Sequence, residues 1–249
     1  MLYAKTTPNY AGVIISGDYR ELDALYMALH MIVGNESDYR KYEGPRLRVL
    51  GVCYDIRHAI MGDGEIEFVD NGMDEFKMKL LEVVTPTKNL QFSFKIYFPE
   101  LFFVMMALND FIRLHAKTKA KQATFPLMDK RVIWDGDVAR VRLFQSIIAE
   151  CLKESVSEAS YTRIFNLLHH EYSWLGGYAT QYLDMLNIEF LYMGKEERKK
   201  KLLTMAKRIS EQGKEYQKVK REVEQSAREY QCPVENIRLK WEYPEKIEW

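Results

Sequence analysis

The sequence predicts an α+β fold, with a mixed, mostly antiparallel sheet and covering helices over residues 1–120 and a helical region over residues 121–249. Three patterns support this prediction. Polar and apolar residues alternate in several short segments before residue 98, helical spacing dominates after it, and a charged segment near 195–230 carries an apolar residue every three or four positions. We therefore expect the helical region to end in a long amphipathic helix and a short strand. The two regions are also compatible with one continuous domain.

The first predicted elements are a hairpin and a helix. Segments 2–5 and 13–16 flank a Pro-Asn pair that favours a turn, which predicts two antiparallel strands. Asp18, with a Glu three residues later, has the spacing of a capping box at the start of a helix. Apolar residues then recur at helical spacing until a Gly-Asn pair, so we expect a helix over 18–33.

The middle of the N-terminal region predicts further strands. Residues 46–60 alternate with a period of two, and the Gly-Asp-Gly sequence that follows is a strong signal for a tight turn. Acidic and apolar residues alternate again over 65–70. Segments 76–84 and 91–98 are also strand-like and are separated by a turn that contains Pro86. We expect these segments to complete the sheet.

The rest of the chain predicts mainly helices. Pro99 stands at the first position of a helix predicted over 99–117, where its missing N–H is tolerated. This helix is apolar almost all round, which predicts a buried position on the sheet. We expect Asp137 to cap the next helix. The remaining predicted elements are helices at about 137–154, 158–172, 178–192 and 195–230, and a strand at 237–243.

The composition is typical of a soluble globular protein. Of the 249 residues, 47% are hydrophobic and 29% are charged, a balance that excludes a disordered chain. The longest apolar run, Leu101–Leu108, is far shorter than the roughly 20 residues of a membrane span. Three widely separated cysteines exclude a disulfide framework and a cysteine-rich zinc site. Because the N-terminal segment also lacks the pattern of an export signal, we expect a cytoplasmic protein with no membrane span.

Opposite charges are concentrated in two separate segments. The whole chain is neutral, with 36 basic and 36 acidic residues, but residues 194–230 contain 12 Lys or Arg and 7 Glu, a net charge of +5. The interval between Arg57 and Lys77 holds no Lys or Arg, and its acidic residues are Asp63, Glu65, Glu67, Asp70, Asp74 and Glu75. An acidic hairpin and a basic helix attract each other over about 10 Å, within one subunit or between subunits.

The charged segment 195–230 carries an apolar seam that suggests an assembly surface. Most of its seam positions are apolar over four heptads, as in a helix that packs along a partner helix. From this seam we predict a non-catalytic interaction or regulatory subunit, with a protein partner or a homo-oligomer and no cofactor. The alternatives are packing against helix 178–192 of the same chain and, with weak support, nucleic-acid binding by the basic face. The seam consists of Leu202, Met205, Ile209, Gln212, Tyr216, Val219, Val223, Ser226 and Tyr230.

Asp55, Arg57 and His58 form a short cluster of residues suited to acid–base chemistry. On the predicted strand, Asp55 and Arg57 share one face and are close enough to form an ion pair, whereas His58 points to the opposite, apolar face. The structural interpretation is an ion pair and a hydrogen-bonded core histidine. A role in general acid–base catalysis requires a second group from another element.

The predicted order of elements offers one enzymatic alternative. A helix, three strands and a helix resemble the α-β-β-β-α core of the restriction-like nucleases, which hold Mg²⁺ with an Asp and the acid of an Asp/Glu-x-Lys motif. By this resemblance, Asp55, Glu75 and Lys77 form the catalytic set of a Mg²⁺-dependent nuclease or phosphodiester hydrolase, with Glu65 or Glu67 as further ligands. The match is imperfect, because Asp55 lies on the first strand and Glu75 at the start of its strand. No P-loop, dinucleotide-binding or nucleophile-elbow motif is present.

Overall fold

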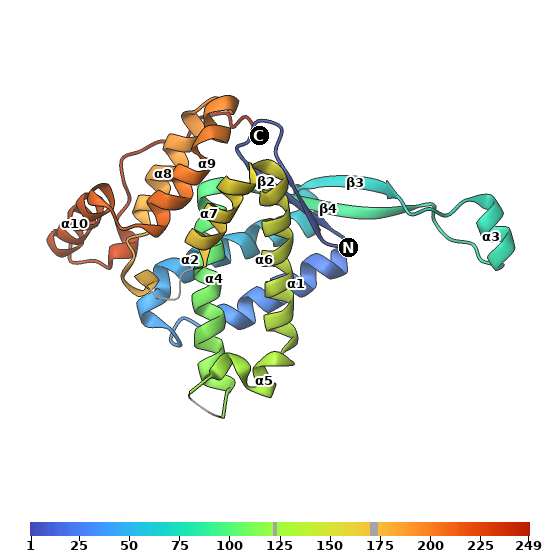
Figure 1. Cartoon of the computed structure of the whole chain (residues 1–249), viewed down its shortest axis with the longest axis horizontal. Helices are drawn as coiled ribbons and strands as arrows, with labels where there is room; N and C mark the ends of the chain where they lie inside the picture. Colours follow the sequence, from blue (N-terminus) through green and yellow to red (C-terminus); the bar gives the residue numbers. More distant parts are fainter. Residues whose placement is uncertain (122–123, 170–173) are drawn as a thin grey trace.

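The computed structural model describes residues 1–121, 124–169 and 174–249 (Figure 1). These residues include a four-stranded antiparallel sheet with the strand order β1-β2-β4-β3. The first two strands form the predicted N-terminal hairpin, and β4 occupies the centre of the sheet beside β2. The strands are β1 (Tyr3–Thr6), β2 (Gly12–Gly17), β3 (Glu65–Asp70) and β4 (Lys88–Tyr97).

Helices pack around one another and against the sheet to form the body of the molecule. The fold class is therefore the predicted α+β arrangement, with sheet and helices in the N-terminal part and a helical C-terminal half. The helices are α1 (Tyr19–Val33), α2 (Glu43–His58), α3 (Glu75–Leu81), α4 (Phe98–Lys119), α5 (Lys130–Ile133), α6 (Gly136–Ser155), α7 (Glu158–Leu168), α8 (Gln181–Tyr192), α9 (Lys195–Ser210) and α10 (Lys214–Glu229). Residues 170–172 of the predicted helix 158–172 lie outside the described residues.

Helix α4 is the centre of the body, as its apolar sequence predicts. Pro99 stands in its first turn, and its side chains are buried on nearly every side between Phe98 and Ile112. The helix packs against α1, α2, α8 and α9, and Figure 1 shows it running through the middle of the helices. One core of buried side chains extends from Leu2 before β1 to Val223 in α10, so the sheet and the C-terminal helices share it.

The segment 46–60, predicted as a strand, is helix α2. Its buried residues Val49, Val52, Cys53 and Ile56 recur three or four positions apart and therefore form one face of a helix. The same apolar residues also satisfy a period of two over short stretches, which is the source of the wrong prediction. Packing of α2 against both α1 and α4 favours the helix, because it buries that face completely.

The prediction of a strand at 76–84 is also wrong, because most of this segment forms the short helix α3. The Asp74 side chain caps this helix by accepting a hydrogen bond from the backbone N–H of Lys77 at 2.8 Å. The helix ends at Glu82, whose φ of 53° is left-handed. The N-cap residue directly before the segment therefore favours a helix. The apolar residues of the segment favour a strand less, because no neighbouring strand is there to pair with them.

The range 195–230 contains two helices, α9 and α10, in place of the single predicted helix. The break lies at 211–213, where Glu211 and Gly213 have extended backbone conformations. The break allows α10 to turn and pack against α8. A continuous straight helix would carry the apolar residues of α10 away from that surface.

The C-terminal segment forms no strand at 237–243, contrary to the prediction. It lies along α8, where the side-chain amide of Gln181 donates hydrogen bonds to the carbonyl groups of Val234 and Ile237 at 2.5 and 2.9 Å. The chain then reaches the end of β4, where the Trp249 ring stacks on Tyr97 with centroids 5.0 Å apart. Side-chain contacts therefore hold this segment, in place of a strand ladder.

Residues 65–91 form an arm that projects from the body. It consists of β3, α3 and the outer part of β4, and Figure 1 shows it extending to the right, with α3 at its tip and no helix of the body beside it. No helix among the described residues is long and apolar enough to cross a membrane.

Candidate functional site

The predicted metal-binding residues are divided between the body and the arm. Asp55 lies on α2, whereas Glu75 and Lys77 lie in the first turn of α3 at the tip of the arm, and Figure 1 shows these two helices far apart. Of the other proposed ligands, Glu65 pairs with Lys95 and Glu67 is exposed on β3. Within the described parts of the chain, no group of three His, Cys, Asp or Glu residues could hold a metal ion. The geometry therefore does not assemble the nuclease-like site.

Asp55 lines a shallow groove at the base of the arm. Because α2 is a helix, Asp55 and Arg57 point in different directions, and no ion pair joins them in the described structure. Burial, followed by the negative charge of Glu100, raises the pKa of Asp55 to about 6, against the lowering effect of His58. The imidazole of His58 lies 2.9 Å from the Asp63 carboxylate, and its side chain is 42% exposed, so it is not the predicted core histidine.

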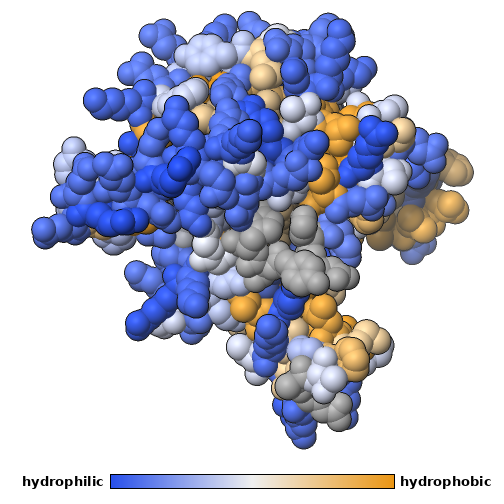
Figure 2. All heavy atoms as spheres, turned by 60° about the vertical axis from the view of Figure 1, so that its left-hand side comes forward, coloured by the Kyte–Doolittle hydropathy of each residue, from blue (hydrophilic) through white to orange (hydrophobic). Residues whose placement is uncertain are grey.

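Six of the nine seam residues lie in the core of the same chain. Tyr216 illustrates this position: its hydroxyl accepts a hydrogen bond from Ala179 N–H at 3.1 Å, and its ring stacks on Tyr178 with centroids 4.9 Å apart. Gln212 and Ser226 are half-buried, and Tyr230 is exposed. Figure 2 turns the side with α8 to α10 forward, and that face is mainly hydrophilic. The seam residues buried in this way are Leu202, Met205, Ile209, Tyr216, Val219 and Val223.

Arg198 is a structural residue that the sequence analysis missed. Its side chain is buried and donates to the carbonyl groups of Phe190 and Leu191 at the end of α8. It also donates to Asn9 in the first hairpin and to Glu248 near the C-terminus, at 3.1 and 2.7 Å. Nothing in the charged sequence of α9 distinguishes this residue from its neighbours, because its partners are distant backbone groups.

One face of the arm is apolar and continues the buried face of the sheet. Ile66 lies opposite Phe92, and Phe68 lies opposite Leu90. Directly opposed residues of antiparallel strands point to the same face, as do alternate residues of one strand. Phe92 is buried in the body, whereas Phe68 beside it in the strip is 66% exposed. The apolar strip therefore leaves the core and runs along the arm into solvent.

The tip of the arm extends this exposed apolar surface. Phe76 is 75% exposed on α3, and the apolar spheres far back at the right-hand edge of Figure 2 belong to this end of the molecule. The opposite face of β3 carries Glu65 and Glu67, which lie opposite Ser93 and Gln91. The exposed apolar side chains of the tip are Phe76, Leu80, Leu81, Val83 and Val84.

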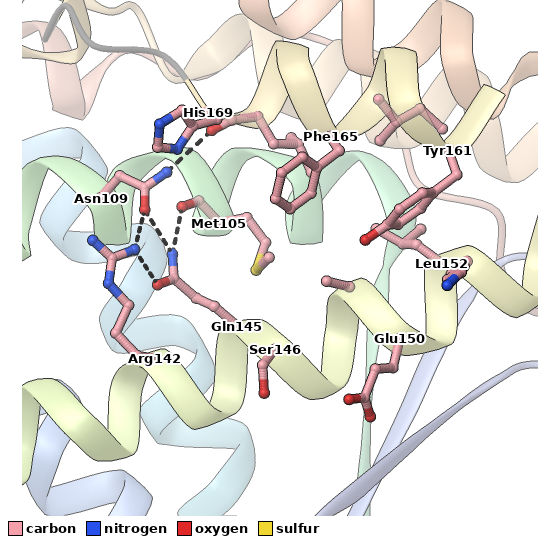
Figure 3. Close-up of a pocket in the computed structure, with 14 residues that line it drawn as sticks. Met105, Asn109, Arg142, Gln145, Ser146, Glu150, Leu152, Tyr161, Phe165 and His169 are labelled. Carbon is pink, nitrogen blue, oxygen red and sulfur yellow. Dashed lines mark hydrogen bonds between the residues drawn. The ribbon is translucent and has the colours of Figure 1, made fainter. Parts of the chain in front are cut away.

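A second concave surface, the cleft, lies between α4, α6 and α7 (Figure 3). Its volume is about 420 Å³, within the range of sites for small molecules. Figure 3 shows Arg142, Asn109 and Gln145 at one end and the rings of Tyr161 and Phe165 toward the other, where the carboxylate of Glu150 lies on the α6 side. The apolar wall is formed by Met105, Leu152, Tyr161, Ile164, Phe165 and Leu168.

The polar end of the cleft is organised around Arg142. Its Nη1 donates to the side-chain oxygens of Asn109 and Gln145 at 2.6 and 2.8 Å. The Gln145 amide in turn donates to the Met105 carbonyl, and the Asn109 amide donates to the Leu168 carbonyl. Three helices therefore fix the position of one guanidinium group at the rim of the cleft.

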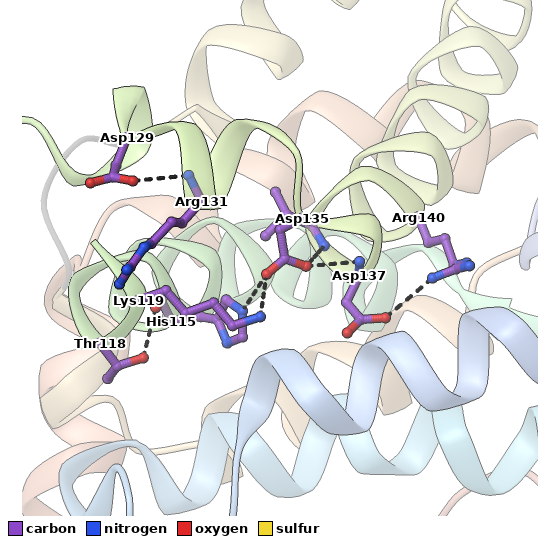
Figure 4. A network of polar contacts seen from close by, with 9 residues as sticks. His115, Thr118, Lys119, Asp129, Arg131, Asp135, Asp137 and Arg140 are labelled. Atoms are coloured by element: carbon purple, nitrogen blue, oxygen red, sulfur yellow. Dashed lines mark hydrogen bonds and ion pairs between the residues drawn. The ribbon is translucent and has the colours of Figure 1, made fainter. Parts of the chain in front are cut away.

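The buried carboxylate of Asp135 lies at the centre of a separate polar network between α4 and α6 (Figure 4). It caps α6 by accepting hydrogen bonds from the backbone N–H groups of Asp137 and Val138, so the N-cap is Asp135, in place of the predicted Asp137. His115 and Lys119 of α4 contact its other oxygen. Burial alone raises the pKa of Asp135, but the hydrogen bonds from Lys119 and His115 outweigh this and hold it well below its usual range. Both carboxylate oxygens of Asp135 accept hydrogen bonds from groups of the chain itself, which indicates a structural role.

Comparison with known proteins identifies the family of the chain. The model of the family described as "Domain of unknown function (DUF6904)" matches residues 2–249. The chain therefore belongs to that family. No curated protein and no solved structure matches it.

Proposed function

We propose that the protein is a non-catalytic interaction subunit that assembles through its arm, residues 65–91. The observation that carries this proposal is the apolar strip from Ile66 to the tip, which leaves the core and stays uncovered in the single chain. Exposed apolar patches of this kind mark surfaces that associate with other proteins. The seam of α9 and α10 does not serve this purpose, because its residues fill the chain's own core.

The partner that best fits the arm is a second copy of the chain. The arm contains six acidic and three basic residues, a formal net charge of −3, whereas α9 contains seven basic and two acidic residues, a formal net charge of +5 that includes the buried Arg198 and the paired Arg208. Figure 1 shows α9 and the tip of the arm on opposite sides of the molecule. The exposed lysines of α9, such as Lys199, Lys200 and Lys201, are therefore available to the arm of another copy. A two-fold axis would form this contact twice.

Direct pairing of two β3 edges is a less suitable mode of assembly. β3 is an edge strand, bonded only to β4 on one side. It carries Glu65 and Glu67, and charged edge residues of this kind discourage strand addition. Contact between the acidic arm and the basic surface of α9 requires no strand addition.

Sedimentation velocity over a range of protein concentrations tests the proposal. We expect wild type to form a dimer that dissociates as salt is raised, because exposed charge pairs are screened. The double variant Phe76→Ser, Leu80→Ser should weaken the dimer by about 10-fold or more, because it removes two exposed apolar side chains from the interface. Reversal of charge at Lys199, Lys200 and Lys201 should also weaken it. Each variant should keep the wild-type circular dichroism spectrum, since these side chains are exposed.

Two matched controls accompany these variants. Tyr230→Ser removes an exposed aromatic ring of similar accessibility from the end of α10, and Lys218→Glu reverses one charge on the exposed face of α10. Both should leave the dimer unchanged. A wild-type protein that stays monomeric at every concentration, or a dimer that survives the arm variants, would overturn the proposal.

A further inference from the structure

We propose that the cleft between α4, α6 and α7 binds a small amphiphilic carboxylate, with Arg142 holding the carboxylate and the apolar wall holding the hydrocarbon part. This inference is independent of the arm, because the cleft lies among the helices of the body. Its volume of about 420 Å³ suits a small molecule and not a protein segment. Four features of the described residues support it.

The first feature is the incomplete bonding of Arg142. Its Nη1 is used by Asn109 and Gln145, but no hydrogen bond from Nε or Nη2 is found within the described part of the chain. Nor does any described carboxylate lie within ion-pair distance of it. A guanidinium group with free donors binds a carboxylate through two parallel hydrogen bonds.

The second feature is the contrast with two other arginines that link helices. Arg48 pairs with Asp184 at 2.7 Å and lies 3.5 Å from Glu100. Arg208 pairs with both Glu189 and Glu215, at 2.7 and 2.6 Å. Each of these side chains receives acidic partners from the chain itself, whereas Arg142 receives only neutral amide oxygens. The difference leaves Arg142 able to accept an acidic partner from outside.

The third feature is the electrostatic environment of Arg142. The Arg142 side chain is exposed at the rim of the cleft, but partial desolvation by its neighbours, followed by the positive charge of Arg113, lowers the pKa of its guanidinium group. An anion at this end of the cleft would counter both effects on Arg142, because its negative charge favours the charged form of the guanidinium group. The acid that lines the cleft, Glu150, projects away from Arg142 at some distance along α6 in Figure 3.

The fourth feature is the position of the apolar wall relative to the cation. Figure 3 shows Phe165 and Tyr161 beyond the amide network, on the side away from Arg142. Leu152 and Ile164 form the buried floor of this part, and Ala149 leaves room above them. A ligand with one charged end and one apolar end matches this arrangement in direction as well as in composition.

Isothermal titration calorimetry with octanoate and phenylpropanoate tests the proposal, with octanamide and phenylpropanamide as neutral probes of the same shape. We expect wild type to bind at least one of the two carboxylates and to bind the matching amide about 10- to 100-fold more weakly, the range expected for charge-assisted hydrogen bonds. Arg142→Gln should reduce carboxylate affinity by a similar factor and remove the preference over the amide. Arg142→Lys should lose part of the affinity, because it keeps the charge but not the fork of donors.

The matched control is Arg140→Gln on the same helix. Arg140 is exposed and pairs with Asp137 at 3.3 Å outside the cleft, so this variant should bind like wild type. Ala149→Leu, which narrows the apolar end without changing a charge, should weaken the binding of carboxylate and amide alike. The proposal is overturned if neither carboxylate binds below about 1 mM, if the amides bind equally well, or if Arg142→Gln behaves like Arg140→Gln.

Discussion

The body and the arm place the same kinds of side chain in opposite environments. In the body, α4 buries phenylalanine and methionine side chains on nearly all sides, and its Phe102 is completely inaccessible. On the arm, Phe68 and Phe76 lie mostly in solvent, although one is on a regular strand and the other on a capped helix. Local structure therefore forms in both regions, but only the body gains free energy by burying its apolar residues.

This comparison separates residues that hold the fold from residues available for contacts. A side chain that fills the core of the body cannot be removed without leaving a cavity. An exposed side chain on the arm contributes little to folding, so its presence there needs another physical reason. Substitutions in the body, on the arm and at their junction test this division, and they follow in order of decreasing effect.

Phenylalanine truncation should distinguish the two regions most clearly. Phe102→Ala in α4 should lower the free energy of unfolding by about 3–5 kcal/mol, because it leaves a cavity in the core. Phe76→Ala in α3 should change it by less than about 0.5 kcal/mol. Urea denaturation at low protein concentration measures both. Equal destabilisation by the two variants would show that the arm packs against the body in solution.

Removal of a buried charge should have the next largest effect. Asp135→Asn should lower the free energy of unfolding by about 2–3 kcal/mol at pH 7, because hydrogen bonds from His115, Lys119 and the start of α6 weaken. Glu67→Gln on the arm is the matched control and should change it by less than about 0.5 kcal/mol.

The effect of Asp135 should also depend on pH with a definite sign. Its pKa is lowered in the folded protein, so its contribution is complete above the unfolded pKa of about 4 and is lost as the pH falls toward the folded pKa. Denaturation midpoints of wild type and Asp135→Asn should therefore converge on acidification. A constant difference down to the lowest pH would contradict the assignment.

Substitution of Asp55, at the junction between body and arm, should have the smallest effect on the free energy of unfolding. The dependence of that effect on pH should have the opposite sign to that of Asp135. The pKa of Asp55 is raised to about 6 by burial, so its ionised form is disfavoured in the folded state. Stability should therefore fall as the pH rises from about 4 to about 6. Asp55→Asn should stabilise the protein at pH 7 by about 1 kcal/mol, a value reduced for the partial exposure of the group. A measured pKa near 4 by carboxyl-carbon NMR would rule this out.

Much of the local structure could be predicted because its cause is local. The capping box holds, with Asp18 and Glu21 exchanging hydrogen bonds at 3.0 and 2.9 Å. Pro99 lies in the first turn of α4, and the alternation before it corresponds to β4. In each case the residues that determine the element lie within the element, so the sequence pattern contains the relevant interactions.

The candidate sites could be predicted only in part. The acidic hairpin 65–70 is correctly placed as a strand, but its projection from the body depends on where the helices end. Arg142 carries no sequence signal, because its partners Asn109 and Gln145 come together only when α4 and α6 pack. Asp55 and Glu75 gave a plausible metal pair in the sequence and lie on different parts of the molecule.

The sequence by itself determined the α+β class, most helices and the presence of an amphipathic face on α9 and α10, since all of these depend on composition and on periodicity over a few turns. Only the tertiary structure decided that 46–60 is a helix and that the seam of Ile209 and Val219 faces its own chain. The physical reason is that an apolar stripe specifies burial but not the surface that provides it. The chain buries the seam of α9 and α10 and leaves the apolar strip of the arm exposed. This difference depends on contacts between residues that are distant in the sequence.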